Sequence, residues 1–186
     1  IPIELIPPTR QQIVSSRSFG IDLSDFDELN QALTALTRKA VNKLNNHKLA
    51  MTTMTVFIYT NPHKKNTPCG HLSKTVGMPI AMEDESQIIP LASQILRLIY
   101  KPGYSFNKGG VVLSNLTKNY RQQDLFSITQ NSQPQVLARK KSNAIKGANK
   151  RFNESVKYES EVGNDRWLPR ANFRSNRYTT SWSELL

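Results

Sequence analysis

Along the first two thirds of the chain, hydrophobic residues recur at the two-residue period of strands in some segments and at the 3.6-residue period of helices in others. The positions where the period changes mark the boundaries of the predicted elements. Residues 11–19 follow a lead-in whose two prolines oppose helix, and their composition predicts a strand. A period of three to four takes over at the apolar positions 29, 33, 36, 40 and 44, which predicts an amphipathic helix. Ser24 is expected to cap this helix, because the acidic residues that follow favour a helix N-terminus.

Two further strands are predicted after this helix. The first covers residues 49–60, where Met54, Val56 and Ile58 alternate with threonine and aromatic residues. A loop with two prolines and a lysine pair follows it. Residues 71–80 then form a third predicted strand, which is weakened by one glycine and one proline.

A second helix and a last strand complete the pattern. Residues 83–85 are expected to open the helix, which carries Ile88, Ala92, Ile95 and Ile99 on one face. Pro90 disturbs this pattern, because a proline here marks either the start of the helix or a kink in it. Residues 105–116 form the fourth predicted strand.

The order of these elements predicts an α+β fold, a four-stranded sheet in βαββαβ order with both helices on one face. The other face of the sheet is expected to be open. We expect this domain to cover residues 13–117, after a lead-in linker at 1–12. A second linker at 118–131 and a small basic C-terminal extension at 132–186 follow it.

Charge indicates the kind of partner. The 186 residues carry a formal net charge of +11, and residues 118–186 contribute +7 of it. Such a charge favours a polyanion, with nucleic acid ahead of a membrane surface. No stretch approaches the roughly 20 apolar residues of a bilayer span. A single cysteine, Cys69, excludes an internal disulfide framework and fits a reducing cytoplasm. The chain lacks an initiator methionine and a secretory signal, and we expect it to be part of a longer protein.

One short motif lies in the polar linker after the predicted domain. Gln122, Asp124, Leu125 and Phe126 have the form of a peptide that docks on the bacterial sliding clamp. Leu125 and Phe126 can fill an apolar pocket while Gln122 forms hydrogen bonds at its rim. We favour clamp docking over the alternative, in which the leucine and phenylalanine pack on the domain itself.

Several separate stretches, in the same order, resemble the little-finger domain and C-terminal extension of Y-family translesion DNA polymerases. Within that family they are most similar to UmuC proteins, the polymerase subunits of bacterial DNA polymerase V. The stretches that carry the resemblance are residues 15–20 (SSRSFG), 38–44, 56–62 (VFIYTNP), 108–113 (KGGVVL), 143–145, 149–152 and 177–182.

This resemblance implies an error-prone DNA polymerase that acts in SOS DNA repair and mutagenesis. It also implies that the catalytic palm, with its magnesium-binding carboxylates, precedes the part of the protein seen here. We expect no catalytic residue and no cofactor within these residues, so this part alone is expected to be inactive. The acidic residues at 22–28 and 83–85 are interpreted as helix-start residues, because they form no convergent set for two metal ions.

The resemblance also implies a DNA-binding role for the sheet. In the family, main-chain amides together with basic and hydroxyl side chains of the little finger contact phosphates of primer–template DNA, which reads the backbone and not the sequence. Arg17 is the strongest candidate, because it lies inside the SSRSFG motif. The candidate DNA contacts are Ser16, Arg17, Ser18, Thr60, Lys64, Lys65, Lys74 and Lys108.

Histidine, cysteine and the aromatic residues of the tail allow other interpretations. His63, Cys69 and His71 lie within nine residues, but structural zinc usually takes four ligands, so we predict loop residues and no metal. Basic and aromatic residues interleave in the tail, where we prefer a small aromatic core to base stacking. These aromatics are Phe152, Tyr158, Trp167, Phe173, Tyr178 and Trp182. The resemblance further implies a UmuD′-like dimer, bound through this tail, and the RecA filament as partners.

Two other classes of protein remain open. A free-standing RNA-binding module of the RRM type has the same element order, and Phe57 with Tyr59 supplies one aromatic pair for it. The chain lacks the basic-glycine-aromatic run of that class. A protein that only competes for the clamp, without touching DNA, is disfavoured by the charge of +11.

Overall fold

The structure is a computed structural model of the chain. Two continuous segments and several short pieces of the C-terminal part are described. They are residues 10–64, 70–118, 144–145, 147–149, 151, 156, 159, 165–169, 175–177, 179–180 and 182.

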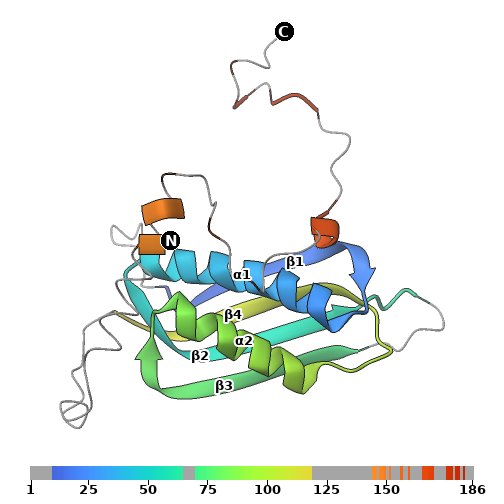
Figure 1. Cartoon of the computed structure of the whole chain (residues 1–186), viewed down its shortest axis with the longest axis horizontal. Helices are drawn as coiled ribbons and strands as arrows, with labels where there is room; N and C mark the ends of the chain where they lie inside the picture. The colour runs from blue at the N-terminus through green and yellow to red at the C-terminus, as the bar shows by residue number, and fades with distance from the viewer. Residues whose placement is uncertain are drawn as a thin grey trace, which may run out of the picture.

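The predicted fold class is confirmed (Figure 1). A four-stranded antiparallel sheet has the strand order β1-β4-β2-β3, so each strand–helix–strand connection passes over one intervening strand. The elements are β1 (Gln12–Leu23), α1 (Phe26–Asn46), β2 (Leu49–Thr60), β3 (His71–Met82), α2 (Glu85–Ile99), β4 (Phe106–Lys118) and the short 3-10 helix η3 (Asp165–Trp167).

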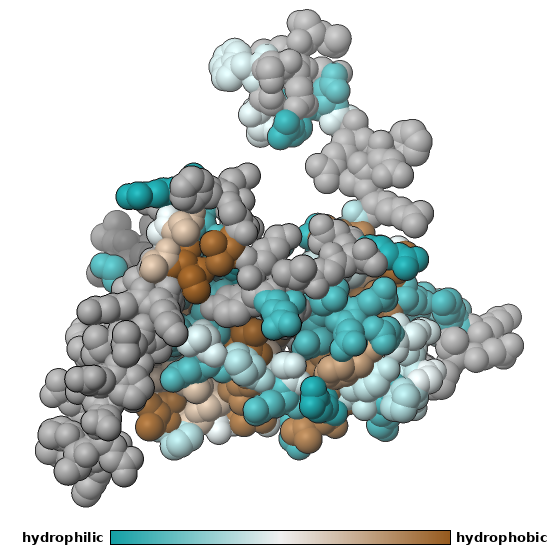
Figure 2. Space-filling view, in the orientation of Figure 1, coloured by the Kyte–Doolittle hydropathy of each residue, from teal (hydrophilic) through white to brown (hydrophobic). Residues whose placement is uncertain are grey.

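Both helices pack on the same face of the sheet, as predicted. Helix α1 contacts β1, β4 and β2, whereas α2 contacts β3 and β2. The core between the layers is aliphatic, and each fully buried side chain of this kind contributes roughly 1.5–3 kcal/mol of hydrophobic stabilisation. The outer surfaces of the helices are mostly hydrophilic, with apolar residues in separate patches (Figure 2). The completely buried core members include Leu29, Leu44, Met54, Val56, Ile58, Ile88, Leu96, Phe106 and Leu113.

The start of α1 differs from the prediction by one residue. Asp25, not Ser24, is the N-cap, and its carboxylate accepts hydrogen bonds from the backbone N–H groups of Asp27 and Glu28, both at 3.2 Å. An aspartate in this position adds a favourable interaction with the helix dipole to the hydrogen bonds that a serine can also accept. Ser24 is engaged elsewhere, because its hydroxyl lies 3.0 Å from the hydroxyl of Ser105.

Pro90 lies inside α2 and does not start it. The helix begins at Glu85, and the side chain of Asp84 caps it by accepting a hydrogen bond from the N–H of Ser86. The proline is in the second turn, where its missing N–H removes one backbone hydrogen bond. The apolar face that was predicted from the sequence is buried on both sides of it, at Ile88, Ala92 and Ile95.

Candidate nucleic-acid interface

The sheet face away from the helices, which we call the open face, has four rows of side chains that run across the strands. Residues directly opposite each other in a sheet point to the same side, so the strand register assigns each residue to a face. None of the residues in these rows is acidic, and half of them carry a hydroxyl group. The rows are Ser18, Lys108, Tyr59, His71; Ser16, Gly110, Phe57, Ser73; Val14, Val112, Thr55, Thr75; and Gln12, Ser114, Thr53, Gly77.

One end of the open face holds a compact group of rings around a lysine. The ring centroids of Phe57 and Tyr59 are 5.1 Å apart, and those of Tyr59 and His71 are 4.1 Å apart. The Nζ atom of Lys108 lies 5.9 Å from the centroid of the Tyr59 ring, a cation–π distance. This contact holds a positive charge close to the sheet, where it can meet a phosphate group.

Gly110 makes the close packing of this group possible. A Cβ atom at this position would lie 2.6 Å from Cζ of Phe57 and 2.5 Å from Cβ of Ser16. Both contacts are too short for any side chain, so glycine at this position leaves room for the end of the phenylalanine ring beside β4. The KGGVVL stretch therefore supplies both the lysine of the open face and the space beside it.

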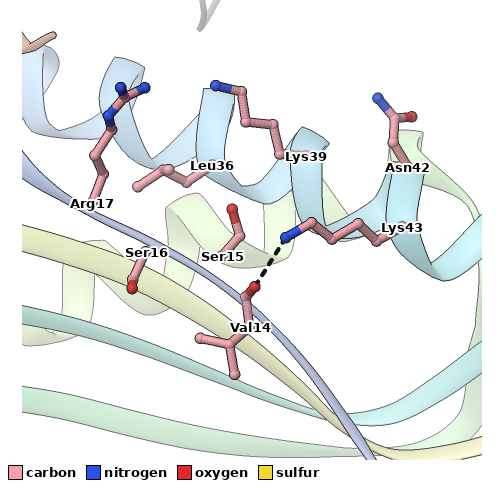
Figure 3. Close-up of a pocket in the computed structure, with 8 residues that line it drawn as sticks. All are labelled: Val14, Ser15, Ser16, Arg17, Leu36, Lys39, Asn42 and Lys43. Carbon is pink, nitrogen blue, oxygen red and sulfur yellow. Dashed lines mark hydrogen bonds between the residues drawn. The ribbon is translucent and has the colours of Figure 1, made fainter. Parts of the chain in front are cut away.

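The predicted DNA contacts divide between the two faces of the sheet. Ser16, Ser18 and Lys108 lie on the open face. Arg17 lies on the side that the helices cover, beside α1 at the free edge of β1 (Figure 3). Lys74 is exposed but lies directly opposite the buried Val56, so it is also on the helix-covered side, at the other edge of the sheet.

Two other predicted contacts have partners within the protein. Thr60 is only 4% exposed, and its hydroxyl accepts a hydrogen bond from the N–H of Gly70 at 2.7 Å and lies 3.3 Å from the carbonyl of Gly70. The hydroxyl of Thr60 therefore closes the β2–β3 hairpin, and its role as a phosphate contact stays a prediction. The Nζ atom of Lys64 lies 2.5 Å from a carboxylate oxygen of Asp22. Lys65 lies outside the described residues.

Arg17 lines a cleft that the sequence did not indicate. The cleft lies between β1 and α1, has a volume of about 470 Å³ and contains two more cations, Lys39 and Lys43. Both lysines lie in the C-terminal half of α1, where positive charge is favourable near the negative end of the helix dipole. Their spacing of four residues places both on one side of α1, which was a signal for a shared site.

The remaining predicted sites are only partly described. The clamp motif at residues 122–126 and Cys69 lie outside the described residues. His71 packs its ring on Tyr59, and within the described ranges no group of three or more His, Cys, Asp or Glu residues could hold a metal ion. Among the described helices, none is long and apolar enough to cross a membrane.

The tail aromatics behave differently from the prediction of a separate aromatic core. Trp167 is 6% exposed and joins the core of the sheet domain, with its ring edge-on to Phe19 at a centroid distance of 6.4 Å. Trp182 is 91% exposed. Phe152, Tyr158, Phe173 and Tyr178 lie outside the described residues.

Comparison with known proteins identifies the family. The model of the impB/mucB/samB family C-terminal domain matches residues 10–125, which include the whole sheet domain. The chain belongs to this family. A second model, for a domain of unknown function (DUF4113), matches residues 142–186.

Relatives of the family match along the full length of the chain. ImpB and UmuC of Salmonella typhimurium are both 28% identical to it, over 100% of this chain and 43% and 44% of their own lengths. DNA polymerase IV of Halorhodospira halophila is 27% identical over 64% of this chain. The chain thus spans less than half the length of the curated relatives it matches. Because the chain is equally identical to ImpB and to UmuC, the identities do not show which of the two it resembles more.

A solved structure confirms the fold of the sheet domain. A Y-family DNA polymerase chimera superimposes with a TM-score of 0.51 and 16% sequence identity, over 64% of this chain and 32% of that chain. The family match identifies the sheet domain as the C-terminal domain of the impB/mucB/samB family, and the likeness in structure supports its fold.

Proposed function

We propose that this chain is the DNA-gripping and clamp-docking C-terminal region of a UmuC-like translesion DNA polymerase. In this proposal the longer protein acts in the bacterial cytoplasm during the SOS response and causes mutations as it copies damaged templates. The observation that carries the proposal is the open face, whose four rows contain hydroxyl groups, a cluster of three rings and Lys108 but no carboxylate.

The open face suits contact with phosphates and not with base edges. Ser16 and Ser18 are exposed and can donate hydrogen bonds, and Lys108 adds a charge held near the sheet by Tyr59. Such contacts position a duplex without reading its sequence, as a polymerase for damaged templates requires. Arg17, and Lys64, Lys65 and Lys74 at the hairpin and far edge of the sheet, extend the basic surface in this proposal.

The clamp-docking part of the proposal rests on residues 122–126. Leu125 and Phe126 are the apolar anchors, while Gln122 and Asp124 provide the polar contacts at the rim. In this arrangement the linker at 118–131 tethers the polymerase to the sliding clamp, and the sheet domain at 13–117 holds primer–template DNA.

Other partners follow from the UmuC assignment. We assign contacts with a UmuD′-like dimer to the extension at 132–186, and we include the RecA filament as a partner of the longer protein. The polymerisation chemistry, with its magnesium ions, belongs in this proposal to a palm outside these residues.

Two variants separate the two binding functions. The first combines Ser16→Ala, Ser18→Ala and Lys108→Gln on the open face, and the second combines Gln122→Ala, Leu125→Ala and Phe126→Ala in the linker. We expect the first to weaken binding to a primer–template duplex about tenfold, since it removes one charge and two donors. The second is expected to abolish binding to purified bacterial sliding clamp. Fluorescence anisotropy measures the first affinity and calorimetry the second.

Each variant serves as the control for the other. The face variant should bind the clamp like the native chain, and the linker variant should bind the duplex like the native chain. Loss of both affinities in either variant would show that the functions are not separable as proposed. Tighter binding to single-stranded RNA than to duplex DNA would favour the RNA-binding alternative, and clamp binding without any DNA binding would favour the clamp competitor.

A further inference from the structure

The cleft between β1 and α1 is a built site with cations from two elements. Arg17 comes from the strand, and Lys39 and Lys43 come from the helix. In Figure 3 the ends of the Arg17, Lys39 and Asn42 side chains point away from the sheet, toward the mouth of the cleft. The residues that line it are Val14, Ser15, Ser16, Arg17, Leu36, Lys39, Asn42 and Lys43, none of which is acidic.

The positive charge of this cleft is not balanced from within. Lys39 and Lys43 are exposed and four residues apart on one helix, a like-charge spacing that is unfavourable in a helix. Within the described part of the chain, neither Arg17 nor Lys39 forms an ion pair or a hydrogen bond. Three cations with no carboxylate among the lining residues are typical of a site for an external anion.

The polar groups around the cations are able to donate hydrogen bonds. Ser15 is only 6% exposed, yet its hydroxyl points into the space between strand and helix (Figure 3). Asn42 adds an amide at the mouth. A phosphate group accepts hydrogen bonds only, so guanidinium, ammonium, hydroxyl and amide donors together match its chemistry.

The free edge of β1 adds backbone donors beside the cleft. Lys43 donates a hydrogen bond to the carbonyl oxygen of Val14 at 3.4 Å, which shows that this peptide group faces the free edge and not β4. Backbone groups alternate in direction along a strand, so the N–H of Ser16 also faces this edge. An anion in the cleft therefore lies next to an N–H group that has no partner strand.

We propose that this cleft binds a phosphodiester group of the DNA strand that runs along the free edge of β1. This inference rests on the proposed function and adds Ser15, Lys39, Asn42 and Lys43 to its contacts. Neighbouring residues of β1 point to opposite faces of the sheet. A DNA backbone along the edge of β1 therefore meets Ser16 and Ser18 on one side and the cleft on the other. A polyanion with regularly spaced charges fits this continuous surface better than an acidic peptide does.

The test is a DNA titration of the full chain with charge-matched variants. The cleft variant is Lys39→Gln with Lys43→Gln, and the control variant is Arg97→Gln with Lys101→Gln, two exposed cations at the end of α2. We expect the cleft variant to bind a 20-base-pair duplex about tenfold more weakly, and its plot of log K against log salt to be shallower by about two. The control variant, with the same net charge, should keep the native slope.

Equal weakening in both variants would overturn the proposal, because it would show a general charge effect and no site. Native-like DNA binding by the cleft variant would also overturn the cleft proposal. If only the open-face variant lost DNA affinity, the proposed function would stand and the cleft proposal would fall. If the native chain bound poly-glutamate more tightly than duplex DNA, and the cleft variant lost that binding, the site would be assigned to acidic peptides instead. Urea unfolding of each variant confirms that the fold is retained, and Arg17→Gln provides a second variant from the strand side.

Discussion

Replacing Glu85 with alanine is expected to destabilise the sheet domain by about 3–5 kcal/mol, because it removes the buried carboxylate that pairs with the buried guanidinium of Arg38. Nε of Arg38 lies 3.3 Å from Oε1 of Glu85, and the two side chains are only 7% and 4% exposed. This ion pair joins α1 to the first turn of α2. The same guanidinium donates a hydrogen bond to the carbonyl oxygen of Val156 at 3.0 Å. Urea unfolding measures the expected loss.

Two further variants make this prediction specific. The double variant Arg38→Met with Glu85→Leu should recover most of the lost stability, because replacing both partners of a buried pair with apolar residues is often neutral or stabilising. Asp22→Asn removes the exposed partner of Lys64, and a surface pair contributes less than about 1 kcal/mol. If Glu85→Ala lowered the free energy of unfolding no more than Asp22→Asn does, the buried ion pair would have no special role in the stability of this fold.

Replacing Gly20 with alanine is expected to release the Trp167 segment from β1. A Cβ atom at Gly20 would clash with the carbonyl oxygen of Leu168 and would lie 3.0 Å from Cα of Pro169. Both atoms belong to backbone, which cannot turn away as a side chain can. The tryptophan should therefore leave its contact with Phe19, at an expected cost of about 1–3 kcal/mol.

Tryptophan fluorescence measures this release directly. The chain has two tryptophans, and a Trp182→Phe background leaves the buried Trp167 as the single reporter. Its emission should shift to the red and become severalfold more accessible to acrylamide in Gly20→Ala. Gly77→Ala is the matched control, since a Cβ atom there has nothing within 4 Å. Unchanged shielding of Trp167 in Gly20→Ala would mean that the segment does not dock where the structure places it.

The alternation of apolar and polar residues predicted the fold. It also indicated which face of the sheet each candidate site residue occupies, which we did not infer from it. The alternation of Met54, Val56 and Ile58 gave the bounds of β2 as the structure has them. Continued by two residues, it also puts Thr60 on the buried side, so its burial was predictable. The same alternation along β1 places Arg17 on the helix-covered side with Ile13 and Phe19. It therefore predicts that Arg17 and the two serines, Ser16 and Ser18, lie on opposite faces of the sheet.

Long-range contacts account for what the sequence could not predict. Glu85 was assigned to a helix start, which is correct, but no local pattern pairs it with Arg38 on the other helix. Trp167 was assigned to a core of its own extension, yet it packs on Phe19 near the other end of the chain. Asp25 and not Ser24 caps α1, and the hydroxyl of Ser24 lies instead beside that of Ser105, which is equally remote in sequence.

Titration of the native chain with duplex DNA over a range of salt concentrations tests the central claim most directly. The open face and the β1–α1 cleft together offer Lys108, Arg17, Lys39 and Lys43 to phosphates. Contact with about four phosphates predicts weak binding, independent of base sequence, whose log K falls against log salt with a slope of about −3 to −4. Binding that does not change with salt concentration, or no binding to DNA at low salt, would contradict the account.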